Sequence, residues 1–383
     1  MKSIFWALII LIFYCYFGYP LLLFLFAKLF SRPVRKSNFE PSISICMSVC
    51  DEEDVIENRI RNILSLDYPP EKLEIIIGSD GSVDKTNEMI RNCRDSRVRL
   101  FESQARRGKM ATLNEIVRHA KNEIVVFADA RQTFAQNAIH ELTGNFADVK
   151  VGCASGELIF KKGEGATAKG VNLYWEYEKF LRKHESEIHS MIGATGAIYA
   201  IRRELYIPPP ANTVLDDVFI PLKIVEKGFR AIFDEKAEAY DAAADSPKEE
   251  YRRKARTLYG NYQIFFSLPW IFNPLKSPIA LQVFSHKFLR VMIPFFLIII
   301  FLMNIFWLSE KVFSTIFLLQ VVFYGMAFVG ALLRYNEKGF LKVMSKVCYI
   351  PYVFCLLNFS ALAGFFRFLG AKQDITWEKA RKK

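Results

Sequence analysis

The sequence predicts an α/β domain built on a mixed, Rossmann-like sheet and flanked by transmembrane helices. In the centre of the chain, short apolar runs that suit buried strands alternate with helical segments. Elsewhere, apolar runs long enough to cross a bilayer occupy 4–27, 291–308, 312–333 and 347–366. We therefore expect an N-terminal transmembrane helix with its basic flank (1–36), the α/β domain (37–247), an interfacial amphipathic segment (248–286) and a C-terminal transmembrane region with a basic tail (287–383).

The first apolar run is predicted to be a membrane anchor. It is too long for the apolar part of a signal peptide, and no small-residue cleavage site follows it. Basic residues follow at once (Lys28, Arg32, Arg35 and Lys36), so the positive-inside rule places the central domain in the cytoplasm. Much of the net charge of +11 lies beside apolar runs, which favours contact with anionic membrane lipids and argues against nucleic-acid binding.

The C-terminal apolar runs leave one question of topology open. Three full spans after a cytoplasmic domain would place the C-terminal tail outside the cell. That tail is basic, however, and carries Lys372, Lys379, Arg381, Lys382 and Lys383. Either one of the three runs is interfacial or the positive-inside rule is broken here.

Three predicted strands of the central domain end in carboxylates. The strand 42–49 runs into Asp51 and Glu53, the strand 73–77 into Asp80 and Asp84, and the strand 123–128 into Asp129. A further short strand is expected at 97–101, and helices at about 52–65, after 84 and after Lys109. Open α/β sheets bind ligands at the carboxyl ends of their strands, so these acids indicate a site, although each alone could cap a helix.

Basic residues at the mouth of the helix after residue 108 indicate that the ligand carries phosphates. Arg106, Arg107 and Lys109 lie where helix geometry favours anions. A nucleoside diphosphate would use carboxylates for its base and ribose and cations for its two phosphates. Alone, Lys109 could equally be a solvated lysine at a helix end.

These residues resemble the motifs of the family 2 glycosyltransferases, in particular the membrane-bound branch that includes cellulose, hyaluronan and poly-N-acetylglucosamine synthases. The matching elements, in the family's order, are Val49-Cys-Asp51-Glu52-Glu53, Ser79-Asp80-Gly81-Ser82-Val83-Asp84-Lys85-Thr86, Gly108-Lys109 with Leu113-Asn114, Asp129, Gly193-Ala-Thr-Gly196-Ala197 and Leu215-Asp216-Asp217. With the flanking membrane segments, the resemblance covers nearly the whole chain. It implies a domain of the GT-A type.

The resemblance also implies roles for the acids and for Lys109. Asp51, Glu53 and Asp80 would contact the nucleoside, Lys109 would lie near it, and Asp129 would hold the Mg²⁺ or Mn²⁺ that bridges the diphosphate. The family's D-x-D motif reads Asp129-Ala-Arg131 here, so a cation replaces the second acid. One carboxylate can suffice for Mg²⁺; alternatively, Arg131 contacts the phosphates in place of a metal.

The second half of the domain is predicted to carry the acceptor side. After a helix at 170–189, the small residues around Gly196 would lie under the acceptor sugar, although a Gly-rich turn explains them equally well. Asp217 corresponds to the family's catalytic base and Asp216 to its acidic neighbour. Acids in the first turn also stabilise any helix by up to about 1 kcal/mol, so capping could account for the pair.

The segment 248–270 is basic at its start and aromatic at its end, which is typical of an interfacial helix. Processive synthases carry Q-x-x-R-W near this point, and this chain does not match it. Arg253, Arg256, Gln263 and Trp270 are the candidate substitutes; the alternative is a lipid-facing basic helix.

The sequence thus predicts an inverting hexosyltransferase of a bacterial inner membrane. Its donor would be a UDP-linked nucleotide sugar, and its acceptor a growing polysaccharide or a lipid-linked glycan. Two alternatives stay open: transfer of one sugar to a polyprenyl phosphate, and an inactive scaffold or export partner.

Overall fold

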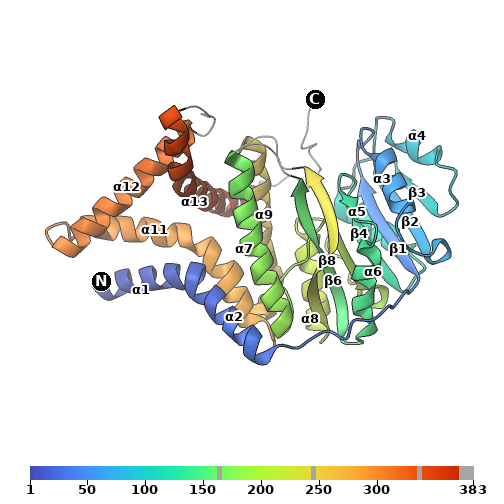
Figure 1. Ribbon diagram of the computed structural model, residues 1–383, viewed down its shortest axis with the longest axis horizontal. Coiled ribbons are helices and arrows are strands. Elements are labelled where there is room, and N and C mark those ends of the chain that lie inside the picture. Colours follow the sequence, from blue (N-terminus) through green and yellow to red (C-terminus); the bar gives the residue numbers. More distant parts are fainter. Residues whose placement is uncertain (162–165, 243–246, 334–338, 371–383) are drawn as a thin grey trace. The chain divides into compact units, whose positions relative to one another are not determined.

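The computed structural model describes residues 1–161, 166–242, 247–333 and 339–370 (Figure 1). The basic tail with Lys372 and 379–383 lies outside the described residues. The chain forms two compact units. The sheet unit contains Phe26–Lys161 and Lys179–Ala242. The helical unit contains Met1–Leu25, the part of α7 (Ala166–Ile188) up to Glu178 and the described chain from α9 (Pro247–Ser267) onward.

The sheet unit holds an eight-stranded sheet with the order β3-β2-β1-β4-β7-β6-β8-β5. Its strands are β1 (Ile43–Val49), β2 (Leu73–Asp80), β3 (Val98–Ser103), β4 (Ile124–Ala128), β5 (Thr133–Phe134), β6 (Val151–Lys161), β7 (Ile198–Arg202) and β8 (Arg230–Ala242). Strands β1 to β4 are mutually parallel, and β7 pairs antiparallel with both β4 and β6. The predicted mixed sheet is confirmed, and its early strands lie where apolar runs predicted them.

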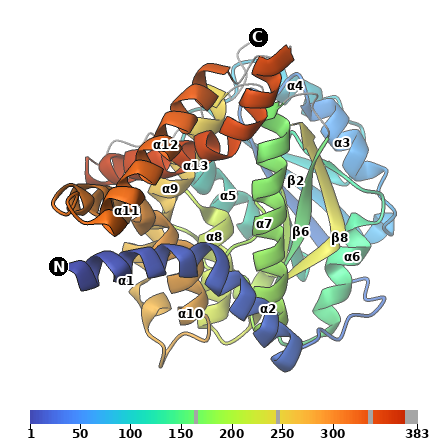
Figure 2. The ribbon, with the colours of Figure 1, turned by 60° about the vertical axis from the view of Figure 1, so that its left-hand side comes forward.

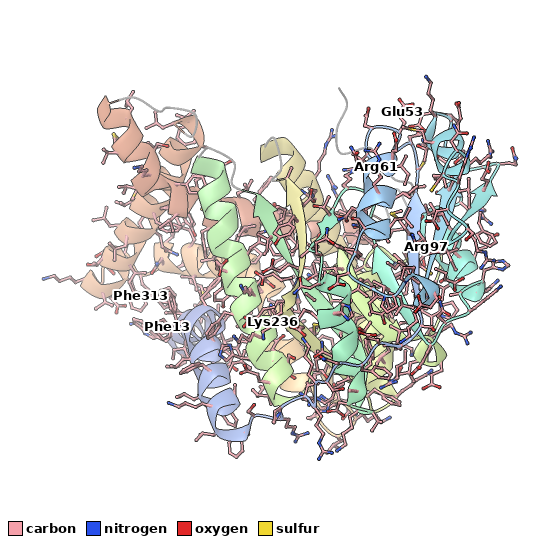
Figure 3. All side chains as sticks on the ribbon, turned by 45° about the vertical axis from the view of Figure 1, so that its right-hand side comes forward. Phe13, Glu53, Arg61, Arg97, Lys236 and Phe313 are labelled. Carbon is pink, nitrogen blue, oxygen red and sulfur yellow. The ribbon has the colours of Figure 1, made fainter. Side chains whose placement is uncertain are left out.

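The parallel strands bring the predicted carboxylates to one edge of the sheet. β1 lies between β2 and β4, and all seven residues of β1 are buried, as an uninterrupted apolar strand requires. Glu53, just past the carboxyl end of β1, and Arg97, just before the amino end of β3, mark opposite ends of the sheet (Figure 3).

Helices cover both faces of the sheet. They are α3 (Ile56–Leu64), α4 (Thr86–Arg91), α5 (Lys109–Arg118), α6 (Ala138–Thr143) and α8 (Asp216–Glu226). Helices α3 and α6 share one hydrophobic core with the face of β1 that carries Ile43, Ile45 and Met47. Helix α5 packs against β1 and β2 through Met110, Leu113 and Ile116.

One predicted helix boundary was wrong. The helix expected from about residue 52 begins at Ile56. The backbone N–H of Glu52 donates to the Thr86 hydroxyl (2.8 Å), which holds the acids after β1 against the turn after β2.

Among the described residues, four helices are long and apolar enough to cross a membrane: Lys2–Phe30, Ala280–Ile305, Lys311–Leu333 and Val343–Leu369. The first three consist of α1 (Lys2–Phe13), the π-helical η1 (Tyr14–Gly18), α2 (Tyr19–Phe30), α10 (Ala280–Gln282), the π-helical η6 (Val283–Phe288), α11 (Leu289–Ile305) and α12 (Lys311–Leu333). The fourth is part of α13 (Gly339–Leu369). Helix α1 runs beside α11, where Phe5 packs against Ile300 (Figure 2). The four apolar runs read from the sequence are thus all helices.

Two further helices complete the chain. Helix α7 (Ala166–Ile188) contributes to both units, and α9 (Pro247–Ser267) packs along α13. The contact of α9 with α13 is aromatic, with Tyr262 against Phe365 and Phe368. Part of the aromatic end of α9 therefore packs against α13.

Candidate functional site

The junction after β1 is bound to the turn after β2. Asp51 adopts a left-handed backbone conformation with φ 54°, which non-glycine residues rarely do. Its carboxylate accepts the N–H of Val83 (2.8 Å) and pairs with Arg106, while Glu53 accepts the N–H of Lys85 (3.0 Å). A strained residue fixed by several partners is typical of a functional site.

The carboxylate of Asp80 organises the beginning of α5. It is buried and accepts the backbone N–H groups of Arg107 (2.7 Å) and Gly108 (2.9 Å) and the hydroxyl of Thr112 (3.2 Å). Gly108 has φ 92° and Gly81 has φ 65°, and a Cβ on Gly81 would lie 2.8 Å from the nitrogen of Arg106. Glycine is therefore required where the two loops meet.

Lys109 joins two carboxylates that are far apart in the sequence. Its Nζ lies 3.4 Å from Asp129 at the end of β4 and 3.3 Å from Asp216 at the start of α8. Asp216 also accepts a hydrogen bond from the Tyr199 hydroxyl (3.4 Å) and is almost fully buried. The structure thus brings together Lys109, Asp129 and the acidic pair that the sequence singled out.

Asp217 is the titratable group whose environment best suits a base. Removal from water and the neighbouring Asp216 carboxylate raise the pKa of Asp217 to about 6, against the opposing effects of Lys109 and Arg182. A base with a pKa near the working pH takes up a proton and can release it again.

The small residues 193–197 pack against the beginning of α8. The N–H of Ala194 donates to the carbonyl of Asp217 (2.7 Å), and a Cβ on Gly196 would lie 3.1 Å from Oδ2 of Asp217. Gly196 therefore leaves room for the carboxylate of Asp217. Its expected place under an acceptor stays a prediction.

Arg131 forms an ion pair with Glu52. Its guanidinium lies 3.0 Å from Oε1 of Glu52, whose side chain is only 7% exposed. The residue that replaces the second acid of the D-x-D motif therefore pairs with a buried carboxylate just past the end of the adjacent strand β1.

The surroundings of Asp129 fit a divalent cation in part. Asp129 offers one carboxylate, and its neighbour Lys109 is a cation. Across the described ranges, no three His, Cys, Asp or Glu side chains gather as a set that could hold a metal ion. Since Mg²⁺ binds through one or two carboxylates plus substrate phosphates, Asp129 suits a cation that arrives with a diphosphate.

The remaining candidates lie in the helical unit. Arg253, Arg256 and Gln263 belong to α9, and Trp270 lies in the short helix η5 (Pro269–Phe272). Arg253 and Arg256 are exposed, whereas the indole nitrogen of Trp270 is buried and has no hydrogen-bond partner among the described residues. Their proposed acceptor role stays a prediction.

Sequence reasoning missed three neighbours of the acidic groups. Tyr199 contacts Asp216, Arg182 of α7 donates to the Thr195 hydroxyl (2.7 Å) beside Gly196, and Glu52 pairs with Arg131. Only the last carried a signal, because Glu52 and Arg131 have opposite charges and each follows a predicted strand. Tyr199 and Arg182 lie within ordinary strand and helix patterns.

Residues 44–207, which contain most of these site residues, match the family described as Glycosyl transferase family 2. Residues 44–207 are a family 2 glycosyltransferase domain. This domain contains the nucleotide motifs, Lys109 and Asp129, and α8 with Asp216 and Asp217 follows it directly.

Relatives agree with that assignment. A poly-beta-1,6-N-acetyl-D-glucosamine synthase of Staphylococcus aureus is 24% identical over 259 residues, and the match covers 62% of this chain and 62% of the synthase. The chain thus spans about 62% of the length of these synthases. The Bacillus subtilis protein named "Probable glycosyltransferase YdaM" is 21% identical over 282 residues, or 70% of this chain and 67% of that protein.

A solved structure shows the same fold. It is a mannosyltransferase from Pyrobaculum calidifontis in complex with GDP-Man and Mn²⁺, with a TM-score of 0.72 and 22% sequence identity. The match covers 96% of this chain and 99% of the mannosyltransferase. The family 2 glycosyltransferase domain therefore has the GT-A fold that the sequence predicted.

Proposed function

We propose that this protein is an inverting membrane glycosyltransferase that moves a hexose from a nucleotide sugar to an acceptor hydroxyl. The observation that supports it best is the arrangement at one sheet edge, where Asp217, with its raised pKa, lies next to Asp216, which Lys109 links to Asp129. A base, a cation and a strand-end carboxylate are the parts that sugar transfer from a diphosphate requires.

The reaction is a single displacement. The Asp217 carboxylate takes the proton of the acceptor hydroxyl while the acceptor oxygen bonds to the anomeric carbon. The bond from that carbon to the diphosphate breaks, and the nucleoside diphosphate leaves with the bonding electrons. Attack from the face opposite the leaving group inverts the anomeric configuration.

Asp51, Glu53 and Asp80 shape the nucleoside side of the donor site. Asp51 and Glu53 join the junction after β1 to the turn after β2, and Asp80 fixes the loop that carries Lys109. Lys109 faces the diphosphate. Asp129 would hold Mg²⁺ or Mn²⁺, which would offset the charge that grows on the leaving group.

The donor is UDP-linked and the acceptor is a growing polysaccharide or a lipid-linked glycan at the cytoplasmic face of a bacterial inner membrane. The four apolar helices and the likeness to a poly-beta-1,6-N-acetyl-D-glucosamine synthase support this proposal. Transfer of a single sugar to a lipid phosphate is the alternative; a polymer ladder would favour the synthase, and a single glycolipid would favour the alternative.

The decisive test is transfer by the purified full-length protein from a panel of radiolabelled UDP- and GDP-sugars, with Asp217→Asn as the matched variant. The variant keeps the size of the side chain and removes its basicity. We expect loss of transfer with nearly unchanged UDP affinity, because the nucleotide contacts belong to other junctions. Near-normal turnover by Asp217→Asn would refute the assignment of the base, and no transfer from any donor would favour the scaffold.

A further inference from the structure

A second cluster of charged side chains lies within the helical unit, apart from the residues assigned to sugar transfer. Glu178 of α7 is buried and pairs with Arg290 of α11. The same carboxylate lies 3.2 Å from Nε2 of His286 and 4.0 Å from Nζ of Lys287. One carboxylate thus faces three basic side chains among the described residues.

The helices around this cluster are distorted. His286 and Lys287 belong to the π-helical segment η6, and the first candidate span contains a π-helical segment of its own, η1. The two segments touch, because the hydroxyls of Tyr14 and Ser285 are 2.8 Å apart and the thiol of Cys15 donates to the carbonyl of Ser285 (3.6 Å). π-Helical turns occur frequently at functional sites, and here two of them meet beside a charged cluster.

The cluster lies at one end of the apolar part of a span. The 17 residues of α11 begin beside it and extend about 26 Å at about 1.5 Å per residue, close to the roughly 30 Å of a bilayer's hydrocarbon core. Near the other end of α11, Lys2 pairs with Glu310. If α11 crosses a bilayer, the Glu178 cluster would lie at the depth of the lipid head groups.

Among the described residues, the cluster holds more basic than acidic side chains. Joining α7 to α11 needs one cation opposite Glu178, and Arg290 supplies it. His286 and Lys287 add further basic groups at the same carboxylate, and the side chains of Lys287 and Arg290 remain 20% and 17% exposed. Guanidinium and ammonium groups together are typical of sites that bind phosphate.

We propose that Lys287, Arg290 and His286 form a binding site for the phosphate group of a lipid-linked acceptor, with Glu178 holding the basic side chains in place. This inference rests on the proposed function and selects its alternative acceptor, a lipid phosphate. The nucleotide motifs take no part in the site.

The test uses the full-length protein in a neutral detergent and measures equilibrium binding of radiolabelled farnesyl phosphate. We expect saturable binding that unlabelled farnesyl phosphate displaces and farnesol does not. Lys287→Gln should weaken farnesyl phosphate binding about tenfold, because one charged contact is lost. Arg290→Lys should also weaken it, because the planar guanidinium group that binds phosphate through two N–H groups is lost. UDP binding should stay unchanged in both variants.

Lys311→Gln is the matched control, because Lys311 is a basic residue at the start of another candidate span, next to Glu310. Unchanged farnesyl phosphate binding is expected in this variant. Equal binding by wild type and by folded Lys287→Gln would overturn the proposal, as would equal competition by farnesol. If phosphatidylglycerol competed as well as farnesyl phosphate, the site would take ordinary phospholipid and the acceptor assignment would be wrong.

The proposal can fail independently of the proposed function. Sugar transfer that proceeds with a raised KM for farnesyl phosphate and an unchanged kcat in Lys287→Gln would support both. Specific farnesyl phosphate binding without any transfer would retain the site and refute the enzyme. Transfer with the same KM and kcat in wild type and Lys287→Gln would retain the enzyme and refute the site.

Discussion

Asp216 and Asp217 are adjacent in the sequence but have different surroundings. Asp216 is buried against Tyr199 and Lys109, whereas Asp217 packs against Gly196 and has the raised pKa. The Asp216 carboxylate, which pairs with Lys109, makes Asp217 harder to ionise. In the proposed reaction, Asp216 is the charged neighbour and Asp217 is the base.

The pKa of Asp217 predicts how transfer depends on pH. Because the base must be ionised, the rate should fall as the pH drops through about 6, the pKa of Asp217. Asp216→Asn removes the like charge and should move this acid limb to lower pH. Initial rates between about pH 5 and 8 would check it; an acid limb that Asp216→Asn leaves in place would show that another group titrates.

Asp129 predicts a requirement for a divalent cation. EDTA should abolish transfer and added Mn²⁺ should restore it, because Lys109 alone would not stabilise the negative charge of the leaving diphosphate sufficiently. Asp129→Asn should weaken Mn²⁺ binding in the presence of UDP, measured by calorimetry. Activity that survives EDTA but is lost in Arg131→Lys would assign the phosphate contact to Arg131 instead.

At the scale of elements, the beginning of α5 depends on Asp80. Asp80→Ala should weaken UDP binding and also lower the melting temperature, because two backbone N–H groups and the Thr112 hydroxyl lose their acceptor. Asp84→Ala is the control: Asp84 accepts the N–H of Thr86 at the start of α4 (3.0 Å), so its loss should cost about 1 kcal/mol of stability and little affinity. Equal affinity losses on calorimetric titration with UDP would contradict this division of roles.

The ion pair between the ends of β1 and β4 makes a separate prediction. Arg131→Gln leaves Glu52 buried without its cation and should cost about 2 kcal/mol of unfolding free energy. The double variant Glu52→Gln/Arg131→Gln removes both charges and should recover much of that loss. Thermal unfolding of the single and double variants measures it; additive losses would show that the two side chains do not depend on each other.

Sequence patterns predicted the local features of these elements but not the contacts between distant parts of the chain. Strands β1, β2 and β4 follow from apolar runs, and the carboxylates after them follow from strand ends, because both properties are local. The contact of Lys109 with Asp216 is not local, since it depends on β7 inserting antiparallel beside β4 and on α8 following it. Likewise, the hydrogen bond from the N–H of Glu52 to Thr86 joins two loops that are distant in the sequence, and no local pattern predicts it.

At the scale of the whole molecule, four apolar runs were enough to predict the membrane helices, but not the polar contacts within them. Asn304 of α11 is fully buried and donates to the side chain of Gln320 in α12 (2.7 Å). Amide side chains in apolar helices stabilise helix pairs when they bind one another, typically by about 1 kcal/mol. Neither residue could be paired from the sequence, because no pattern fixes the rotation of two apolar helices.

The Asn304–Gln320 contact predicts a non-additive pair of variants. Gln320→Leu should destabilise the protein by about 1 kcal/mol, because Asn304 then lies buried with no donor or acceptor opposite it. Asn304→Leu/Gln320→Leu should be closer to wild type. Melting temperatures in detergent measure both, and a double variant less stable than either single one would contradict the prediction.

This hydrogen bond also has a consequence for biosynthesis. Asn304 and Gln320 belong to consecutive helices, α11 and α12, joined by a short connection between Ile305 and Lys311. Neither amide has its partner until both helices have been synthesised, and an unpaired amide is costly in lipid. Partition of α11 from the translocon into the bilayer would therefore wait for α12, and the two helices would enter the membrane together as a hairpin.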